Sequence, residues 1–273
     1  MRLGLFMMPL HPPHRPMHET LAEDEQKCLV ADRLGFDEVW CGEHFSATTE
    51  PVASPLMFFA GLVHRTKLDF GTGVINLPNH HPAIVAAGVA QFDHMSKGLL
   101  LFGIGSGGLA SDFELFGDIA PMERGKRMVE AIETIQKIWA SDPPYEFGGP
   151  TWPISIKKAV LPDFGVGFMP KPYQQPGPSV QISARIADSY GVQRAAARGW
   201  GVISANFVAS RILAGHWRSM RKGLAEAGRP VNGAMWRVAR NITVAATDAE
   251  ARARVTAPEG ATHYYFNYLS SLA

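Results

Sequence analysis

His44 is the residue of this chain best suited to transfer a proton. It follows Glu38–Cys41, a run whose composition is typical of a β-strand, and Glu43 directly precedes it. An imidazole titrates near neutral pH, so a histidine at the end of a strand can accept and release a proton in a site. A hydrogen-bonded structural histidine is the alternative that position alone leaves open. We therefore take His44 as the first catalytic candidate.

His80 and His81 lie near the end of a second polar stretch, residues 71–82. Together with Glu43 and His44 they could form a metal site. However, adjacent residues of an extended chain point to opposite sides, and no His-x-His or Glu-x-x-His spacing supports a metal here. We therefore expect no metal at this site.

A phosphate could bind where residues 185–190 end a strand and begin a helix. Backbone N–H groups at a helix start attract anions, and Arg185 and the Ser189 hydroxyl would add to that attraction. Asp188 could instead be an ordinary helix cap, which would compete with an anion. Both interpretations remain open from the residues alone.

A glycine-rich stretch, residues 103–108, formally matches the dinucleotide fingerprint Gly-x-Gly-x-x-Gly. That fingerprint needs a helix to open directly after it, whereas acidic and glycine-broken sequence follows here up to Asp118. A dinucleotide site is therefore not expected. The stretch is better interpreted as a wall without side chains, where a flat ring system can approach the backbone.

The elements that must position these residues are strands that alternate with helices. Three times in the first 110 residues a β-type run ends in glycine and polar residues. This pattern predicts an α/β fold, a TIM (β/α)8 barrel with its chemistry at the carboxyl ends of the strands. The expected strands cover residues 3–8, 38–41, 68–73, 99–103, 180–183, 202–204 and 236–245, and the expected helices cover 19–34, 55–64, 82–95, 121–140, 189–198 and 212–227, with a further helix capped by Asp248.

Two features depart from a regular barrel within the single domain expected for residues 1–273. Residues 142–178, after the fourth barrel helix, are crowded with prolines and glycines and contain one strand-like run, 156–161. An insertion this long in a compact domain is typical of a functional or mobile segment. Only seven strands are visible, and no eighth strand–helix unit follows the aromatic segment 264–268. The sequence thus predicts a barrel that lacks its C-terminal unit.

The composition is that of an ordinary globular protein, with 46% apolar residues and a net charge of +1. This charge argues against an extended nucleic-acid or membrane-surface footprint. The N-terminus lacks the features of a signal peptide, and no apolar run approaches the ~20 residues of a membrane span, so we expect a cytoplasmic protein. Cys28 and Cys41 are interpreted as small buried hydrophobic residues.

Four segments, in order along nearly the whole chain, resemble one known family. They are Gly42-Glu-His44, the Gly-Thr-Gly-x-x-x-Leu-Pro-x-x-His-Pro pattern of 71–82, Asp93-His-Met-Ser-Lys-Gly98 with Phe102-Gly103, and Arg194-Ala-Ala-x-x-Gly199. Each motif is weak alone, but the ordered set is specific. The chain resembles the bacterial luciferase-like, flavin-dependent monooxygenases, and within them the limonene and diketocamphane monooxygenase branch.

The resemblance implies a barrel that binds reduced FMN at its C-terminal rim, and it implies that residues 142–178 form a mobile lid over the active site. A separate flavin reductase would supply the flavin, which would react with O2 to give a C4a-peroxide that transfers one oxygen atom to a small apolar organic substrate. In this family's chemistry His44 would assist the reaction, and His81 is a secondary catalytic candidate.

The resemblance also assigns cofactor contacts. It implies a cis peptide between Gly73 and Val74 under the flavin ring, and a phosphate loop at Ala184, Ser189 and Tyr190. Ser106 stands where luciferases carry a phosphate-binding arginine, so Arg185 could take that role instead.

Uncharged residues near the strand ends would form the walls of a substrate pocket; they are Met8, Phe45, Phe102, Asn206 and Phe207. The resemblance further implies a homodimer, paired through residues 55–64 and 82–95. Two alternatives remain. One is a deazaflavin-dependent oxidoreductase that transfers hydride in the same barrel, and the other is a non-catalytic flavin-binding partner subunit.

Overall fold

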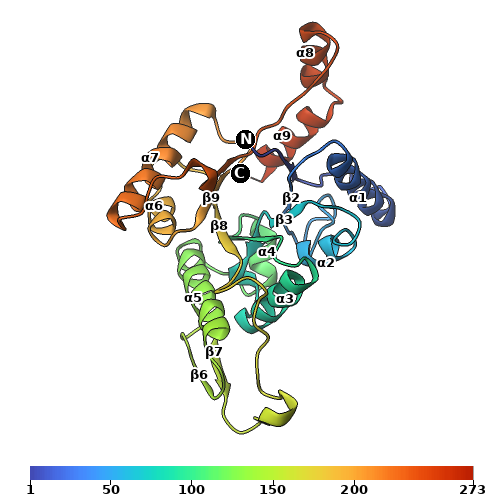
Figure 1. Cartoon of the computed structure of the whole chain (residues 1–273). Coiled ribbons are helices and arrows are strands. Elements are labelled where there is room, and N and C mark those ends of the chain that lie inside the picture. Colours follow the sequence, from blue (N-terminus) through green and yellow to red (C-terminus); the bar gives the residue numbers. More distant parts are fainter. Residues whose placement is uncertain (273) are drawn as a thin grey trace.

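A computed structural model describes residues 1–272, and its central feature is a parallel β-sheet with helices around it (Figure 1). Seven strands follow the order β1-β2-β3-β5-β8-β9-β10, and the short β4 also pairs with β5. The strands are β1 (Gly4–Met7), β2 (Glu38–Cys41), β3 (Asp69–Thr72), β4 (Ile75–Asn76), β5 (Leu100–Gly105), β8 (Ser179–Ala184), β9 (Gly201–Ser204) and β10 (Trp236–Val238). The predicted α/β alternation is confirmed, while the strand expected over 236–245 is only three residues long.

Nine helices are described in residues 1–272, in addition to short 3₁₀ turns. They are α1 (Met17–Arg33), α2 (Pro55–Ala60), α3 (Pro82–Met95), α4 (Ala110–Leu115), α5 (Pro121–Ala140), α6 (Tyr190–Ala197), α7 (Ser210–Glu226), α8 (Asp248–Thr256) and α9 (Ala261–Ser271). The apolar stripe of α5 is buried as its spacing predicts, with Ile132 and Ile135 fully covered. None of these helices is long and apolar enough to cross a membrane.

The register of the first three strands brings their carboxyl ends to one level. Met7 pairs with Cys41, and Cys41 pairs with Thr72. The residues that follow these three strands therefore leave the sheet side by side. On the other side of the sheet, Ala184 at the end of β8 pairs with Ser204 at the end of β9. Loops from both halves meet at this rim.

The sheet has two ends in its strand order, β1 and β10, and no backbone pairing joins them within residues 1–272. The C-terminal helix α9 contacts the first half of the chain instead. Its Tyr264 hydroxyl lies 2.9 Å from the Thr49 hydroxyl, and Tyr268 donates a hydrogen bond to Glu50. Residues at the two ends of the sequence thus contact each other beside the rim.

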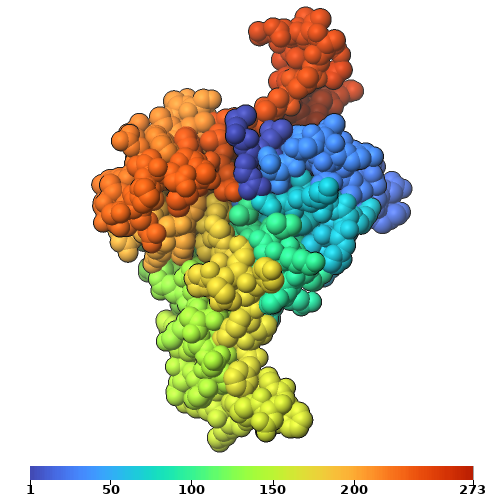
Figure 2. All heavy atoms as spheres, viewed as in Figure 1, coloured from blue at the N-terminus to red at the C-terminus, as the bar shows by residue number. Residues whose placement is uncertain are grey.

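The predicted insertion, residues 142–178, contains an antiparallel hairpin of β6 (Tyr145–Gly148) and β7 (Pro153–Ile156). It projects away from the body of the molecule, at the bottom of the view in Figure 2. Its returning segment is fixed where α3 ends and β5 begins, because Gln174 hydrogen-bonds the Asp93 carboxylate and the Leu100 carbonyl. This is the amino end of β5, opposite to the rim.

Helix ends differ from the predictions for local reasons. Helix α2 stops at Ala60, where Gly61 follows, rather than at residue 64. Thr247, and not Asp248, caps α8, because the Thr247 hydroxyl accepts the Glu250 N–H at 3.2 Å. Asp248 is the first residue of that helix, where its charge favours the helix dipole.

Candidate functional site

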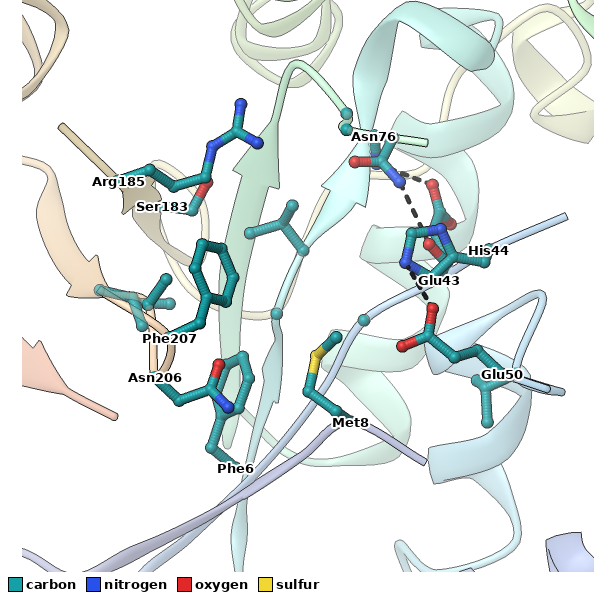
Figure 3. Close-up of a pocket in the computed structure, with 18 of the residues that line it drawn as sticks. Phe6, Met8, Glu43, His44, Glu50, Asn76, Ser183, Arg185, Asn206 and Phe207 are labelled. Carbon is teal, nitrogen blue, oxygen red and sulfur yellow. Dashed lines mark hydrogen bonds and ion pairs between the residues drawn. The ribbon is translucent and has the colours of Figure 1, made fainter. Parts of the chain in front are cut away.

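A pocket opens at the carboxyl ends of the strands, where the sequence pattern places the chemistry (Figure 3). Its space, including the solvent-filled open mouth, is ≈ 920 Å³. Residues from both halves of the chain line it, among them Phe6, Met8, Glu43, His44, Glu50, Asn76, Ser183, Arg185, Asn206 and Phe207. In Figure 3 the acidic residues and His44 lie on one side, with Arg185 and Phe207 on the other.

Backbone atoms form part of the pocket wall between these two sides. Gly42, Gly73 and Val74 all line it, and the Gly73–Val74 peptide is cis, as the family resemblance implies. A Cβ at position 42 would lie 2.8 Å from the Gly73 carbonyl oxygen. Glycine at position 42 therefore lets the ends of β2 and β3 approach closely.

His44 lies between two buried carboxylates. Its Nε2 is 3.0 Å from Oε2 of Glu50, and its Nδ1 is 3.5 Å from Oδ2 of Asp112. The distance between Nε2 and Glu50 is that of an ion pair or a hydrogen bond. In contrast, Nδ1 forms no hydrogen bond with any of the described residues. The side chain is 23% exposed, at the pocket surface. The prediction that His44 points into the mouth of the site agrees with this position.

Both carboxylates are fixed by other parts of the chain. Asp112, from α4, accepts hydrogen bonds from the backbone N–H groups of Phe45 and Ser46 and from the Ser46 hydroxyl. Glu50 accepts a hydrogen bond from Tyr268 of α9 at 3.0 Å. Burial raises the pKa of Glu50, and His44 and Tyr268 offset this only in part. The site therefore holds a carboxyl group that keeps its proton to a higher pH than usual.

Glu43 and His80 form a second carboxylate–histidine pair near the first. His80 was considered from the sequence only as a possible metal ligand. Glu43 accepts the Asn76 N–H at 2.7 Å, and its Oε1 lies 2.8 Å from Nε2 of His80. His81 is not among the pocket residues; its Nδ1 accepts the Ala83 N–H and caps α3. The geometry thus gives His81 a structural position rather than the secondary catalytic one expected.

Arg185 is a cationic residue on the side of the pocket opposite to His44. It lines the pocket with Ser106, and a Cβ at Gly108 would lie 3.3 Å from its guanidinium. Among residues 1–272 Arg185 has no ion-pair partner within 4.0 Å. A free guanidinium at a pocket mouth suits an anion.

The sequence left open whether the start of α6 binds a phosphate or is capped by Asp188, and the structure shows a different cap. Ser189 is the cap, because its hydroxyl accepts the Val192 N–H at 3.3 Å. Asp188 pairs instead with Arg218 at 2.9 Å. Ala184, Ser189 and Tyr190, which the resemblance assigned to the phosphate, are not among the residues that line the pocket.

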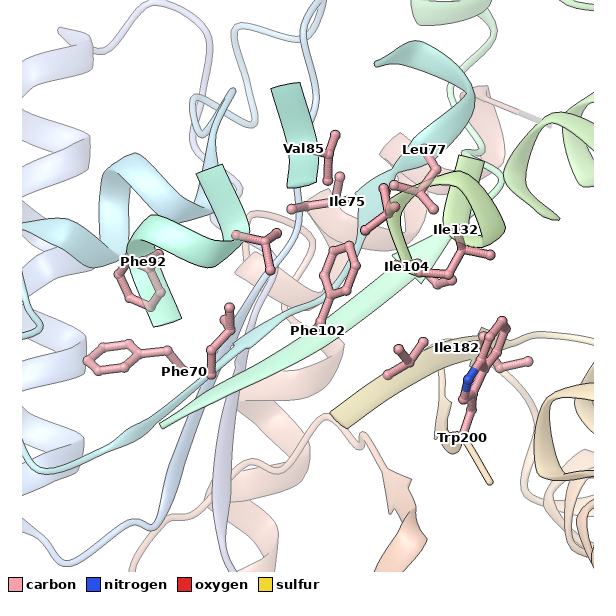
Figure 4. Packing of buried hydrophobic residues seen from close by; sticks show 14 of the residues in the cluster. Phe70, Ile75, Leu77, Val85, Phe92, Phe102, Ile104, Ile132, Ile182 and Trp200 are labelled. Atoms are coloured by element: carbon pink, nitrogen blue, oxygen red, sulfur yellow. The ribbon is translucent and has the colours of Figure 1, made fainter. Parts of the chain in front are cut away.

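The predicted substrate residues divide into three groups. Met8, Asn206 and Phe207 line the pocket. Phe45 lies beside it, packed against His80 and Phe116. The prediction for Phe102 is wrong, because its side chain is fully buried in the core between the sheet and the helices (Figure 4).

The proposed lid does not lie over the pocket in this structure. No residue of 142–178 lines it, and the segment is fixed at the amino end of β5. The sequence reasoning also missed Glu50, Asp112 and Tyr268. Only Tyr268 had a signal in the sequence, the Tyr-rich composition of 264–268. The contacts of this cluster join distant elements, which no local pattern shows.

The pattern of the family described as "Luciferase-like monooxygenase" matches residues 1–270. Limonene 1,2-monooxygenase of Rhodococcus erythropolis is 33% identical over 275 residues, which cover 98% of this chain and 66% of that protein. The chain thus spans just under two thirds of the length of this curated relative.

Solved structures share the fold. The oxygenating constituent of 3,6-diketocamphane monooxygenase from Pseudomonas putida, in complex with FMN, superimposes with a TM-score of 0.88 at 24% identity, covering 100% of this chain and 75% of that one. An F420-dependent secondary alcohol dehydrogenase gives a TM-score of 0.67 at 20% identity, covering 88% and 68%. The predicted TIM-barrel fold is thereby confirmed, and the match over residues 1–270 shows that the chain belongs to the luciferase-like monooxygenase family.

Proposed function

We propose that this protein is a two-component monooxygenase that uses reduced FMN and O2 to oxygenate a small apolar organic compound. The observation that carries the proposal is the arrangement of the pocket. A backbone wall at Gly73–Val74 separates the His44–carboxylate cluster from the free cation of Arg185. Such a site offers a flat surface for a ring, a proton-transfer group beside it and a charge for a phosphate.

The residues present fit FMN. The isoalloxazine would lie against Gly73 and Val74, with Phe6 and Met8 as apolar neighbours. The guanidinium of Arg185, with the Ser106 hydroxyl, would bind the phosphate. Arg185 thus replaces the luciferase arginine for which this chain has Ser106.

Reduced flavin supplies two electrons, with which one oxygen atom of O2 enters the substrate and the other leaves as water. The chain's own residues would bind, orient and exchange protons. His44 would hold or move a proton at the edge of the pocket, while Met8, Val52 and Phe207 keep water from the reacting groups. The apolar walls favour a substrate with few polar groups.

Two partners belong to the proposal. A separate reductase would deliver the reduced flavin, in keeping with the relative whose structure is described as an oxygenating constituent. A second copy of the chain would pair through α2 and α3, where Met57 is 77% and Ile84 is 71% exposed. Because α2 and α3 contact each other, we infer that these side chains belong to one apolar patch, and such a patch suits an interface.

Hydride transfer with a deazaflavin is the second candidate, because an F420-dependent dehydrogenase shares the barrel, with a lower TM-score. The two functions differ in the fate of oxygen. We would incubate the protein with a flavin reductase, FMN and NADH under ¹⁸O2, and supply terpenes and cyclic ketones as substrates. Label in a product supports oxygenation. Oxidised FMN and hydrogen peroxide with every substrate, alongside substrate reduction by reduced deazaflavin, would replace it with hydride transfer.

A His44→Ala variant completes this experiment. His44 and its partner Glu50 line the pocket, whereas its second carboxylate partner, Asp112, is not among the lining residues. Loss of a positioned proton-transfer group lowers turnover by about 10²–10⁴-fold. Full activity in the variant would give His44 a structural role and favour the partner-subunit interpretation.

A further inference from the structure

Glu50 and Tyr268 form a hydrogen-bonded chain that ends on His44. Tyr268 donates to Oε2 of Glu50 at 3.0 Å, and the same oxygen lies 3.0 Å from Nε2 of His44 (Figure 3). Only 3% of the Glu50 side chain is exposed, and it lines the pocket. The three groups come from the loop after β2 and from α9, which makes the contact a tertiary one.

The distances give the two imidazole nitrogens different surroundings. Nε2 faces an oxygen at hydrogen-bond distance, so it carries a proton whenever Glu50 is ionised. Nδ1 is buried and has no hydrogen-bond partner among residues 1–272; Asp112 lies 3.5 Å away without hydrogen-bond geometry. Nδ1 is therefore the nitrogen with a free lone pair in the neutral ring.

We propose that Glu50 is a positioning residue, held by Tyr268, that fixes the His44 proton on Nε2 and thereby sets the tautomer in which the ring takes part in proton transfer. The inference deepens the proposed function, on which its catalytic meaning rests. When Nδ1 gains a proton, Asp112 stabilises the positive ring from the other side. Glu50 and Tyr268 act through His44 and need not touch the substrate.

The charged and polar groups that face the hydrogen-bonded His44, Glu50 and Tyr268 come from several elements. Asp112 approaches from α4, and Tyr268 from α9. Tyr265 of the same helix bonds to Asn206, while His80 is engaged by Glu43. Neither of these competes for the Glu50 oxygen bonded to His44. The proton on Nε2 is therefore set by Glu50.

The test is ¹⁵N nuclear magnetic resonance of the histidine rings in flavin-free protein, between about pH 6 and 10. A His44→Gln variant identifies the His44 signals. We expect a neutral ring protonated on Nε2. In Glu50→Gln, the side-chain amide can donate to Nε2, so the proton should move to Nδ1 and face Asp112. A wild-type ring protonated on Nδ1, or no change in Glu50→Gln, would overturn the proposal.

Tyr268→Phe provides a second readout if Glu50→Gln does not fold. Removing the phenol hydroxyl takes away a hydrogen bond that lowers the pKa of Glu50, so the Glu50 carboxyl signal in ¹³C spectra should titrate at a higher pH. Tyr264→Phe is the matched control, because that hydroxyl lies on the same helix and bonds to Thr49. Equal effects of the two variants would show mere loosening of α9 and contradict the proposal.

These spectra need no flavin, so they remain valid even if the proposed function fails. The catalytic readout is separate. A pH profile of turnover in Glu50→Gln should change shape as well as height, because the neutral ring then carries its proton on the other nitrogen. An unchanged profile with a moved proton would refute a catalytic role for the tautomer, and an unmoved proton would refute the positioning itself.

Discussion

Arg237 on the last strand of the sheet forms two hydrogen bonds of 2.8 Å with Glu38 on the second strand. Glu38 is 5% exposed and also accepts a hydrogen bond from the Trp40 indole. Since β10 and β1 are not paired, this side-chain contact joins the last strand of the sheet to the second strand without backbone pairing. The bidentate pair is the strongest geometry available to an arginine and a carboxylate.

Replacing Arg237 with methionine should destabilise the protein by about 3 kcal/mol, because a buried carboxylate would lose its bidentate partner and keep the longer 3.5 Å contact with Arg2. Chemical denaturation monitored by tryptophan fluorescence measures this change. Arg254→Met is the matched control, since Arg254 pairs with Glu250 on an exposed helix surface, and it should cost less than about 1 kcal/mol. Equal losses in the two variants would contradict a special role for Arg237.

The same pair predicts how stability depends on pH. Burial alone would raise the pKa of Glu38, but hydrogen bonds from Arg237 and Trp40 outweigh it and hold the pKa below 4.5. A group with a lowered pKa contributes its stability above the unfolded value, and that contribution is lost as the pH falls through the folded value. The free energy of unfolding should therefore fall below pH 4.5, with a weaker fall in Arg237→Met.

Arg185→Gln should weaken the binding of FMN by roughly 10- to 100-fold, as expected when a charge-assisted hydrogen bond is lost. Riboflavin, which has no phosphate, provides the control ligand. Its affinity should be the same for the variant and the wild type. If Arg185→Gln weakened both flavins equally, Arg185 would contact the ring or support the pocket rather than the phosphate.

Gly42→Ala should disturb the backbone wall of the pocket. The added Cβ would lie 2.8 Å from the Gly73 carbonyl, so the Gly73–Val74 segment must shift. We expect flavin affinity to fall by about tenfold or more and stability by ~1–3 kcal/mol. Gly125→Ala, where a Cβ meets nothing within 4 Å, is the control and should leave flavin binding unchanged. Normal binding by Gly42→Ala would place the flavin elsewhere.

Met57→Glu and Ile84→Glu test the proposed dimer. Both residues are exposed on α2 and α3, and a buried charge at an interface costs several kcal/mol. Analytical ultracentrifugation should show a dimer for the wild type and a monomer for each variant. Met122→Glu, on α5 and 85% exposed, should remain dimeric. A wild-type monomer, or dissociation by all three variants, would reject pairing through α2 and α3.

Local sequence signals predicted the barrel elements because each depends on neighbouring residues. The stripe on α5 and the runs of β2 and β8 have the composition of their structure. The side chain of Phe102 could not be assigned in this way. Strand β5 is buried on both faces, so alternation does not distinguish the barrel interior from the layer under the helices.

Contacts between distant elements limited the prediction of the site. Tyr268 lies 218 residues from Glu50, and no local pattern shows that they meet. Likewise, the 3₁₀ turn Leu77–Asn79 directs His80 towards Glu43 and His81 towards the start of α3. Strand alternation alone separates these two histidines but does not say which one contacts Glu43.

Oxygenation by reduced FMN can be tested by titrating the protein anaerobically with reduced FMN, and in parallel with reduced deazaflavin, and then admitting oxygen. We expect reduced FMN to bind more tightly, Arg185→Gln to weaken this binding, and oxygen then to oxidise the bound flavin. Tighter binding of the deazaflavin with no reaction with oxygen, or binding of neither cofactor, would rule out the proposed monooxygenase.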